Sequence, residues 1–79
     1  MLKTGNKGPV FMVVVRDDQK GKVIVERWFH SEEAAFQFND RMIKQHAERN
    51  PNISIDVLFG DSVKEIRRQW PEVFRPTTR

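Results

Sequence analysis

The side chains best suited to acid–base or metal chemistry are few. His30 is followed closely by Glu32 and Glu33, and an imidazole near two carboxylates could share a proton or hold a metal ion. The same acidic pair also suits the first turn of a helix, where carboxylates face the positive end of the helix dipole. The chain has two histidines and no cysteine, and no third ligand stands at a recognisable spacing. We therefore expect no metal site and no cofactor.

The other ionisable candidates each have a structural explanation. His46 falls on the apolar side of a predicted helix, where a hydrogen-bonded packing role is expected. Asp17 and Asp18 lie in a segment with the composition of a turn, and Asp56 alternates with apolar residues and should face solvent. No Ser-His-Asp set, glycine-rich phosphate loop or nuclease-like carboxylate–lysine cluster can be assembled. The sequence predicts a protein that is not an enzyme, and a pocket holding both a histidine and a carboxylate would argue against this.

Aromatic side chains beside arginines form a second kind of candidate. They occur at residues 27–28 and 67–70, and such pairs can stack on nucleic-acid bases or anchor a protein interface. Trp70 also has the helical spacing of a core residue. Trp28 alternates with polar neighbours, which is more typical of an interface rim.

The charge distribution does not favour nucleic-acid binding. The net charge is +3, but residues 9–66 hold eight Lys or Arg against ten Asp or Glu, so the positive charge lies in the end segments. Nucleic-acid-binding domains usually concentrate their basic residues on one folded face. We keep this class as the alternative. The residues it would use are Arg27, Arg67, Arg68, Arg75 and Arg79.

Length and composition limit the class of protein. Seventy-nine residues make one domain, whose small core needs some supplement to be stable, and the absence of cysteine means that disulfides cannot provide it. The absence of cysteine also fits a reducing cytosol. The longest apolar run, Val10–Val15, is far too short to cross a membrane, and residues 1–8 do not resemble a signal peptide. We expect a cytoplasmic protein with no membrane partner.

Three segments have the pattern of strands. Val10–Val15 is apolar at every position, which is typical of a strand covered on both faces and therefore central in its sheet. Residues 17–21 have the composition of a hairpin loop, with Gly21 available for a positive φ. Lys22–Phe29 should return as the second strand. Ile53–Phe59 alternates as a third, and its odd-numbered residues, including Phe59, should face the core under the long helix.

One long helix is predicted between the second and third strands. Ser31 is a good N-cap, and the helix should run to about Arg49 and stop at the Asn-Pro-Asn of residues 50–52. Its polar arc covers only about 100° of the helical wheel. Two apolar seams remain, one with Ala34, Ala35, Phe38 and Met42, and the other with Phe36, Ile43 and Ala47.

A short second helix follows the third strand. Ser62 and Glu65 have the spacing of a capping box, and Pro71 should end the helix. Residues 72–74 are predicted to be a compact continuation. The apolar stripe of this helix holds Val63, Ile66 and Trp70.

These elements define one topology. A right-handed crossover from the second strand to the third places the third beside the first. The prediction is a single α+β domain over residues 1–79, ordered β-β-α-β-α, with a three-stranded antiparallel sheet in the order 2-1-3. One long and one short helix pack on the sheet, and residues 1–8 and 75–79 should be flexible tails.

The apolar surface exceeds what the two helices should cover. If Arg16 pairs with Lys22, one sheet face carries Phe11, Val13, Val15, Val23, Val25 and Phe29, and the other carries Val10, Met12, Val14, Ile24 and Trp28. The second sheet face and the second seam of the long helix are both left over, and the short helix can cover only one of them. An apolar patch of more than a few hundred Å² usually marks a partner site. Alternatively, residues 70–74 fold back and complete the core within one chain.

The sequence therefore favours a small protein-interaction module that acts as a homodimer, a bacterial or phage accessory protein without chemistry of its own. The dimer is expected to form through the second sheet face or through the Phe36, Ile43 and Ala47 seam of the long helix, with Trp28 or Phe36 at its centre. The interface candidates are Trp28, Phe36, Ile43, Ala47, Met12 and Ile24.

Overall fold

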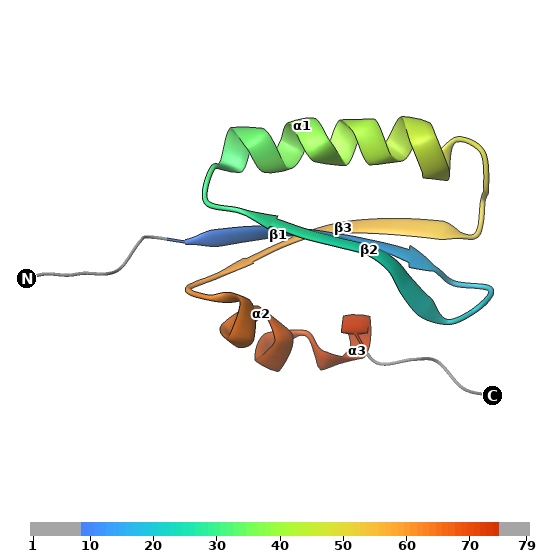
Figure 1. Ribbon diagram of the computed structural model, residues 1–79. Coiled ribbons are helices and arrows are strands. Elements are labelled where there is room, and N and C mark those ends of the chain that lie inside the picture. The colour runs from blue at the N-terminus through green and yellow to red at the C-terminus, as the bar shows by residue number, and fades with distance from the viewer. Residues whose placement is uncertain (1–8, 75–79) are drawn as a thin grey trace, which may run out of the picture.

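The first strand, β1 (Val10–Asp17), lies in the middle of a three-stranded antiparallel sheet, as its doubly apolar pattern predicts. Its neighbours are β2 (Lys22–Phe29) and β3 (Ile53–Gly60), in the order β2-β1-β3 (Figure 1). Residues 12–15 expose no surface at all. The structure is a computed structural model that describes residues 9–74, and the predicted tails lie outside the described residues.

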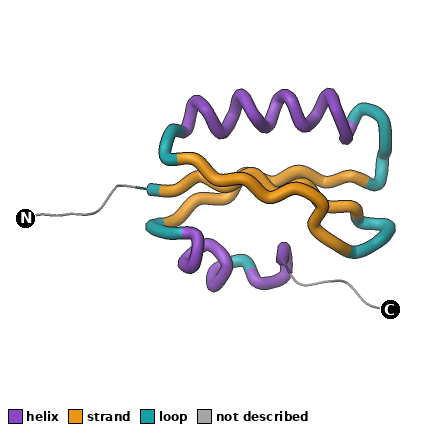
Figure 2. Tube along the Cα trace, in the orientation of Figure 1, coloured by secondary structure: helices purple, strands orange, loops and turns teal. Residues whose placement is uncertain are grey.

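Helices cover both faces of the sheet. α1 (Glu32–Met42) continues into a π-helical turn, η2 (Ile43–Ala47), and the two lie along one face. α2 (Val63–Gln69) and the single turn α3 (Pro71–Phe74) lie against the other, so that three layers result (Figures 1 and 2). The predicted α+β architecture, with its strand order, is confirmed.

The predicted helix caps and the predicted hairpin glycine are present in the structure. The Ser31 hydroxyl oxygen accepts a hydrogen bond from the Ala34 N–H at 3.2 Å, and the Ser62 hydroxyl oxygen accepts one from the Glu65 N–H at 3.0 Å. Both serines therefore cap their helices. Gly21 closes the hairpin with a φ of 68°, a backbone conformation that residues other than glycine rarely adopt.

The pairing of β1 with β2 differs from the assumed register. Val15 lies opposite Val25 while Arg16 lies opposite Val23, so Ile24 is an extra residue and forms a β-bulge. The expected pair of Arg16 and Lys22 is therefore wrong by one position. Because the bulge changes the alternation, Val23 packs with the α2 side of the sheet and not with the α1 side.

The second sheet face is covered within the chain. Its buried residues are Val10, Met12, Val14, Leu58 and Ile66, and half-buried Trp70, Val73 and Phe74 pack against them. The Arg16 guanidinium donates a hydrogen bond to the Val73 carbonyl oxygen at 2.6 Å and ties α3 to β1. Of the two alternatives for this face, the C-terminal segment completes the core, while Trp28, which lies opposite Met12, keeps 50% of its surface exposed.

Candidate functional site

The predicted interface residues fall into three places. Trp28 and Ile24 lie on β2, where 50% and 39% of their surfaces are exposed. Phe36, with 46% of its surface exposed, lies on α1, and Ile43 and Ala47 follow in η2. Met12 is fully buried between the sheet and α2, so it offers no surface to a partner. The structure therefore does not bring the six residues together.

Phe36, Ile43 and Ala47, called here the α1 flank, face the β3 side of the molecule. Phe38 packs on Phe29 of β2, with ring centroids 5.5 Å apart. The side of the helix that carries Phe38 therefore faces β2. At about 100° per residue, Phe36 and Ile43 point about 160° and 140° away from Phe38, and Ala47 follows Ile43 in the π-helical turn. The α1 flank therefore lies on the β3 side of the helix, and η2 packs against that strand.

Phe59 is the exposed aromatic residue that the sequence reasoning missed. Its alternation with Ile53 and Ile55 placed it in the core stripe, yet 60% of its surface is exposed. It stands near the end of an edge strand, just before Gly60, beyond the cover of α1. Strand order combined with this terminal position could have identified it. Its ring lies 6.5 Å from that of half-buried Trp70.

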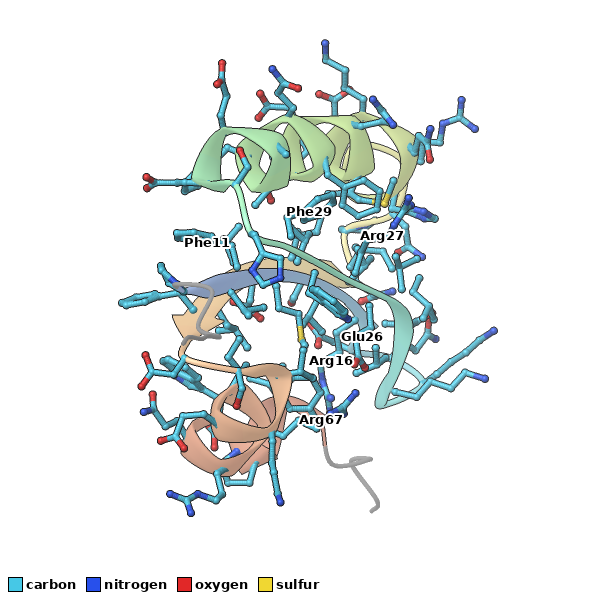
Figure 3. All side chains as sticks on the ribbon, turned by 60° about the vertical axis from the view of Figure 1, so that its left-hand side comes forward. Phe11, Arg16, Glu26, Arg27, Phe29 and Arg67 are labelled. Atoms are coloured by element: carbon cyan, nitrogen blue, oxygen red, sulfur yellow. The ribbon has the colours of Figure 1, made fainter. Side chains whose placement is uncertain are left out.

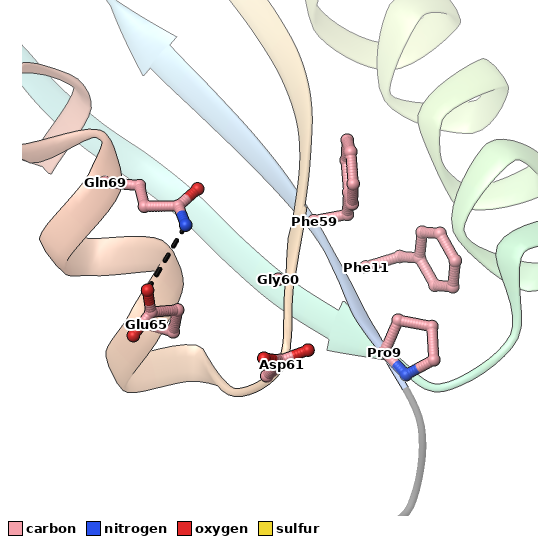
Figure 4. Close-up of a pocket in the computed structure, with 7 residues that line it drawn as sticks. All are labelled: Pro9, Phe11, Phe59, Gly60, Asp61, Glu65 and Gln69. Atoms are coloured by element: carbon pink, nitrogen blue, oxygen red, sulfur yellow. Dashed lines mark hydrogen bonds between the residues drawn. The ribbon is translucent and has the colours of Figure 1, made fainter.

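An open hollow lies beside Phe59, where β3 leads into α2. Its volume is about 560 Å³, and Figure 4 shows Phe11 and Phe59 on the α1 side of the strand and Glu65 and Gln69 on α2. The Gln69 amide donates a hydrogen bond to the Glu65 carboxylate at 3.2 Å. The aromatic rings suit contact with a partner, and the carboxylates of Glu65 and Asp61 have no histidine, serine or threonine beside them among the lining residues. The remaining lining residues are Pro9, Gly60 and Asp61.

A second hollow, of about 280 Å³, contains both a histidine and a carboxylate, which is the combination that would argue for an enzyme. His30 and Asp61 line it together with Ser62 and Trp28. Among the described residues, however, no hydrogen bond joins His30 to Asp61 or Ser62. The His30 ring packs edge-on against Trp28 at 5.6 Å, and the Ser62 hydroxyl caps α2. The hollow thus holds the histidine and the carboxylate without a contact between a nucleophile and a base among the described residues.

Neither a metal-ligating cluster nor a helix able to cross a membrane occurs in residues 9–74. Within this range no three histidine, aspartate or glutamate side chains lie close enough together to hold a metal ion. His30, Glu32 and Glu33 are thus not joined by further ligands. No helix in the same range is both long and apolar enough to cross a membrane.

The candidate arginines are separated by the sheet. Arg27 lies over the Phe38 ring at 5.2 Å on the α1 side, whereas Arg67 pairs with Glu26 and lies over the Phe74 ring at 4.8 Å on the α2 side (Figure 3). Arg68 is on α2 as well, 3.4 Å from the Glu65 carboxylate. Arg67 and Arg68 therefore belong to the folded domain and not to a tail. Arg75 and Arg79 lie outside the described residues.

This arrangement leads us to expect at most weak, non-specific binding to nucleic acid. A chain shortened to residues 9–74 should not shift duplex DNA or structured RNA at sub-micromolar concentration near physiological salt, because Arg27 and Arg67 occupy opposite layers and each has an intramolecular partner. A gel-shift titration measures this, with the full chain as control. A sub-micromolar, steeply salt-dependent shift by the shortened chain would make nucleic-acid binding the leading hypothesis.

No protein-family model, curated protein or solved structure matches this chain.

Proposed function

We propose that this protein is a small non-enzymatic interaction module that acts as a homodimer, an accessory protein of a bacterium or phage. Following the sequence-based expectation, we place it in the cytoplasm. The observation that supports the dimer is the convergence of exposed apolar groups on one side of the domain. Phe36 on α1 and Phe59 on β3 expose about half of their surfaces or more, and both belong to the β3 side.

This side suits a partner better than the opposite one. Trp28 and Ile24 on β2 are exposed to a similar degree, but their strand also carries Lys22, Glu26 and Arg27. On the β3 side, the exposed part of the strand holds one charged residue, Asp56. Interface cores are depleted in charge and enriched in aromatic residues, which favours the β3 side.

The size of the domain is the second support for assembly. A chain of 79 residues buries only about 60–65% of its unfolded surface, so its free energy of unfolding is small. Burial of a phenylalanine side chain contributes about 1.5–3 kcal/mol. Covering Phe36 and Phe59 in both copies of a dimer would therefore stabilise the fold by an amount comparable to its own margin.

Light scattering on the purified chain tests the proposal. One chain weighs 9.4 kDa, and we expect the measured mass to rise toward twice this value between micromolar and millimolar protein. A two-fold dimer is the commonest way for one surface to cover itself, so the mass should level off at two copies. A mass near 9.4 kDa at every concentration would contradict the dimer, and a continuing rise would indicate open-ended association.

A further inference from the structure

The outer edge of β3 presents backbone groups that have no strand partner among residues 9–74. β3 pairs with β1 in one constant register, from Val10 opposite Gly60 to Asp17 opposite Ile53. One position further, the Asp18 N–H donates to the Asn52 carbonyl at 2.8 Å, so the even-numbered residues of β3 bond to β1. In an antiparallel ladder every second residue then points its N–H and C=O the other way. These residues are Ile53, whose N–H bonds to the Asn50 carbonyl oxygen, and Ile55, Val57 and Phe59.

This edge lacks the usual protection against pairing. Edge strands are normally shortened, bulged, or given prolines and charges. β2, the other edge, has the bulge at Ile24 and three charged residues. β3 is eight residues long, contains no proline, keeps an unbroken register and carries only Asp56 as a charge.

We propose that β3 pairs antiparallel with β3 of a second copy about a two-fold axis, with Val57 opposite Val57. The two three-stranded sheets then form one continuous sheet of six strands. This inference rests on the proposed homodimer and specifies its interface. Each outward N–H meets a C=O of the other copy, because Ile55 lies opposite Phe59 and Val57 lies opposite itself.

The single charge on the strand disfavours the neighbouring register, centred on Asp56. A register centred on Asp56 would place the two Asp56 carboxylates opposite each other in a non-hydrogen-bonded pair, with Cα atoms about 4.5 Å apart. Like charges in direct opposition destabilise a strand pair. The Val57-centred register places Asp56 opposite Leu58. It also places the exposed Phe59 ring against Ile55.

The α1 flank identifies the occupant as a second copy. A foreign peptide added to β3 would satisfy the backbone groups but would leave Phe36 and its neighbours uncovered, because a lone strand has no helix above it. A second copy brings its own α1 to the same side of the joined sheet. The two-fold axis makes the flanks antiparallel, so Phe36 of one copy lies toward Ile43 of the other. One partner thus covers both the strand edge and the helix flank.

A single introduced cysteine reports the register. The chain contains no cysteine, so Val57→Cys carries one thiol in an otherwise unchanged protein. In a hydrogen-bonded pair the Cα atoms are about 5.5 Å apart, within the range of about 4.4–6.8 Å for disulfides. Ile55→Cys is the matched control, because its two copies would lie four residues apart along the strand, about 13 Å. Under mild oxidation, we expect Val57→Cys to form covalent dimers on a non-reducing gel at least ten times faster than Ile55→Cys.

Amide hydrogen exchange of the unaltered full chain tests the same pairing without a substitution. The amides of Ile55, Val57 and Phe59 should exchange at least ten times more slowly at millimolar than at low micromolar concentration. The amides of Asp56 and Leu58 bond to β1 and should be protected at both concentrations. They serve as the internal control.

The outcomes separate this inference from the proposed function. A dimeric mass without concentration-dependent protection of the three outward amides overturns β3 pairing and leaves the homodimer standing. Protection without rapid Val57→Cys cross-linking, or faster cross-linking of Ile55→Cys, overturns the register. A monomeric mass at every concentration overturns both proposals.

Discussion

Replacing Phe36 by aspartate is expected to convert the dimer into a folded monomer. Phe36 is exposed over 46% of its surface in the single chain, so its removal leaves the core intact. In the dimer its ring would lie against the α1 flank of the other copy, and an aspartate there would bury an unpaired charge. Interface hot spots contribute about 2 kcal/mol or more, and the substitution occurs twice in a two-fold dimer. The dimer should therefore weaken roughly 1,000-fold, corresponding to about 4 kcal/mol.

Trp28→Asp is the matched control for this experiment. It introduces the same charge in place of an aromatic residue of similar exposure, 50%, but on β2 at the opposite edge of the sheet. Light scattering should find it still dimeric, while circular dichroism should find both variants folded. A Phe36→Asp chain that keeps the dimeric mass would exclude the α1 flank from the interface. A monomeric Trp28→Asp chain beside a dimeric Phe36→Asp chain would move the interface to β2.

Replacing Ile66 by alanine is expected to lower the free energy of unfolding by about 2–5 kcal/mol. Ile66 has no exposed surface and packs in the core cluster with Met12, Val14 and Leu58. A β-carbon added at Gly60 would stand only 3.0 Å from the Ile66 side chain, so strand and helix are in close contact here. Alanine leaves a cavity that these neighbours cannot fill. The loss is a large fraction of the total stability of a domain this small.

Urea unfolding followed by circular dichroism measures this loss. All variants are compared at one protein concentration, because dimerisation adds a concentration-dependent term to stability. Ile24→Ala is the control, since the same chemical change at a residue that is 39% exposed should cost less than about 1 kcal/mol. Equal losses for the two variants would mean that α2 is not held against the sheet as described.

The fold could be predicted largely because its signals are local. Val10–Val15 is apolar at both its odd- and its even-numbered positions, which marked it as the central strand. Only a strand covered on both faces can bury the side chains of both faces. Ser31 and Ser62 each precede an amphipathic run, and both form the predicted caps. The strand order then followed from the handedness of one crossover.

The surface was harder to predict, because it depends on which segments cover one another. The bulge at Ile24 moved Val23 to the other face, and one extra residue in a strand leaves no clear trace in a short apolar pattern. Phe59 fits the core alternation of its strand. Its exposure follows from its place at the end of an edge strand, which the alternation does not encode.

By itself, the sequence determined the elements, their order and the central strand, because periods of two and of 3.6 residues are properties of neighbouring residues. Only the tertiary structure decided that the C-terminal segment covers the second sheet face. The contacts that hold it there, from Arg16 to Val73 and from Arg67 to Glu26, join residues 57 and 41 positions apart. Such pairs depend on how the layers pack, and no local pattern specifies them. Within residues 9–74, the same packing leaves the β3 edge and the α1 flank uncovered on one side of the domain.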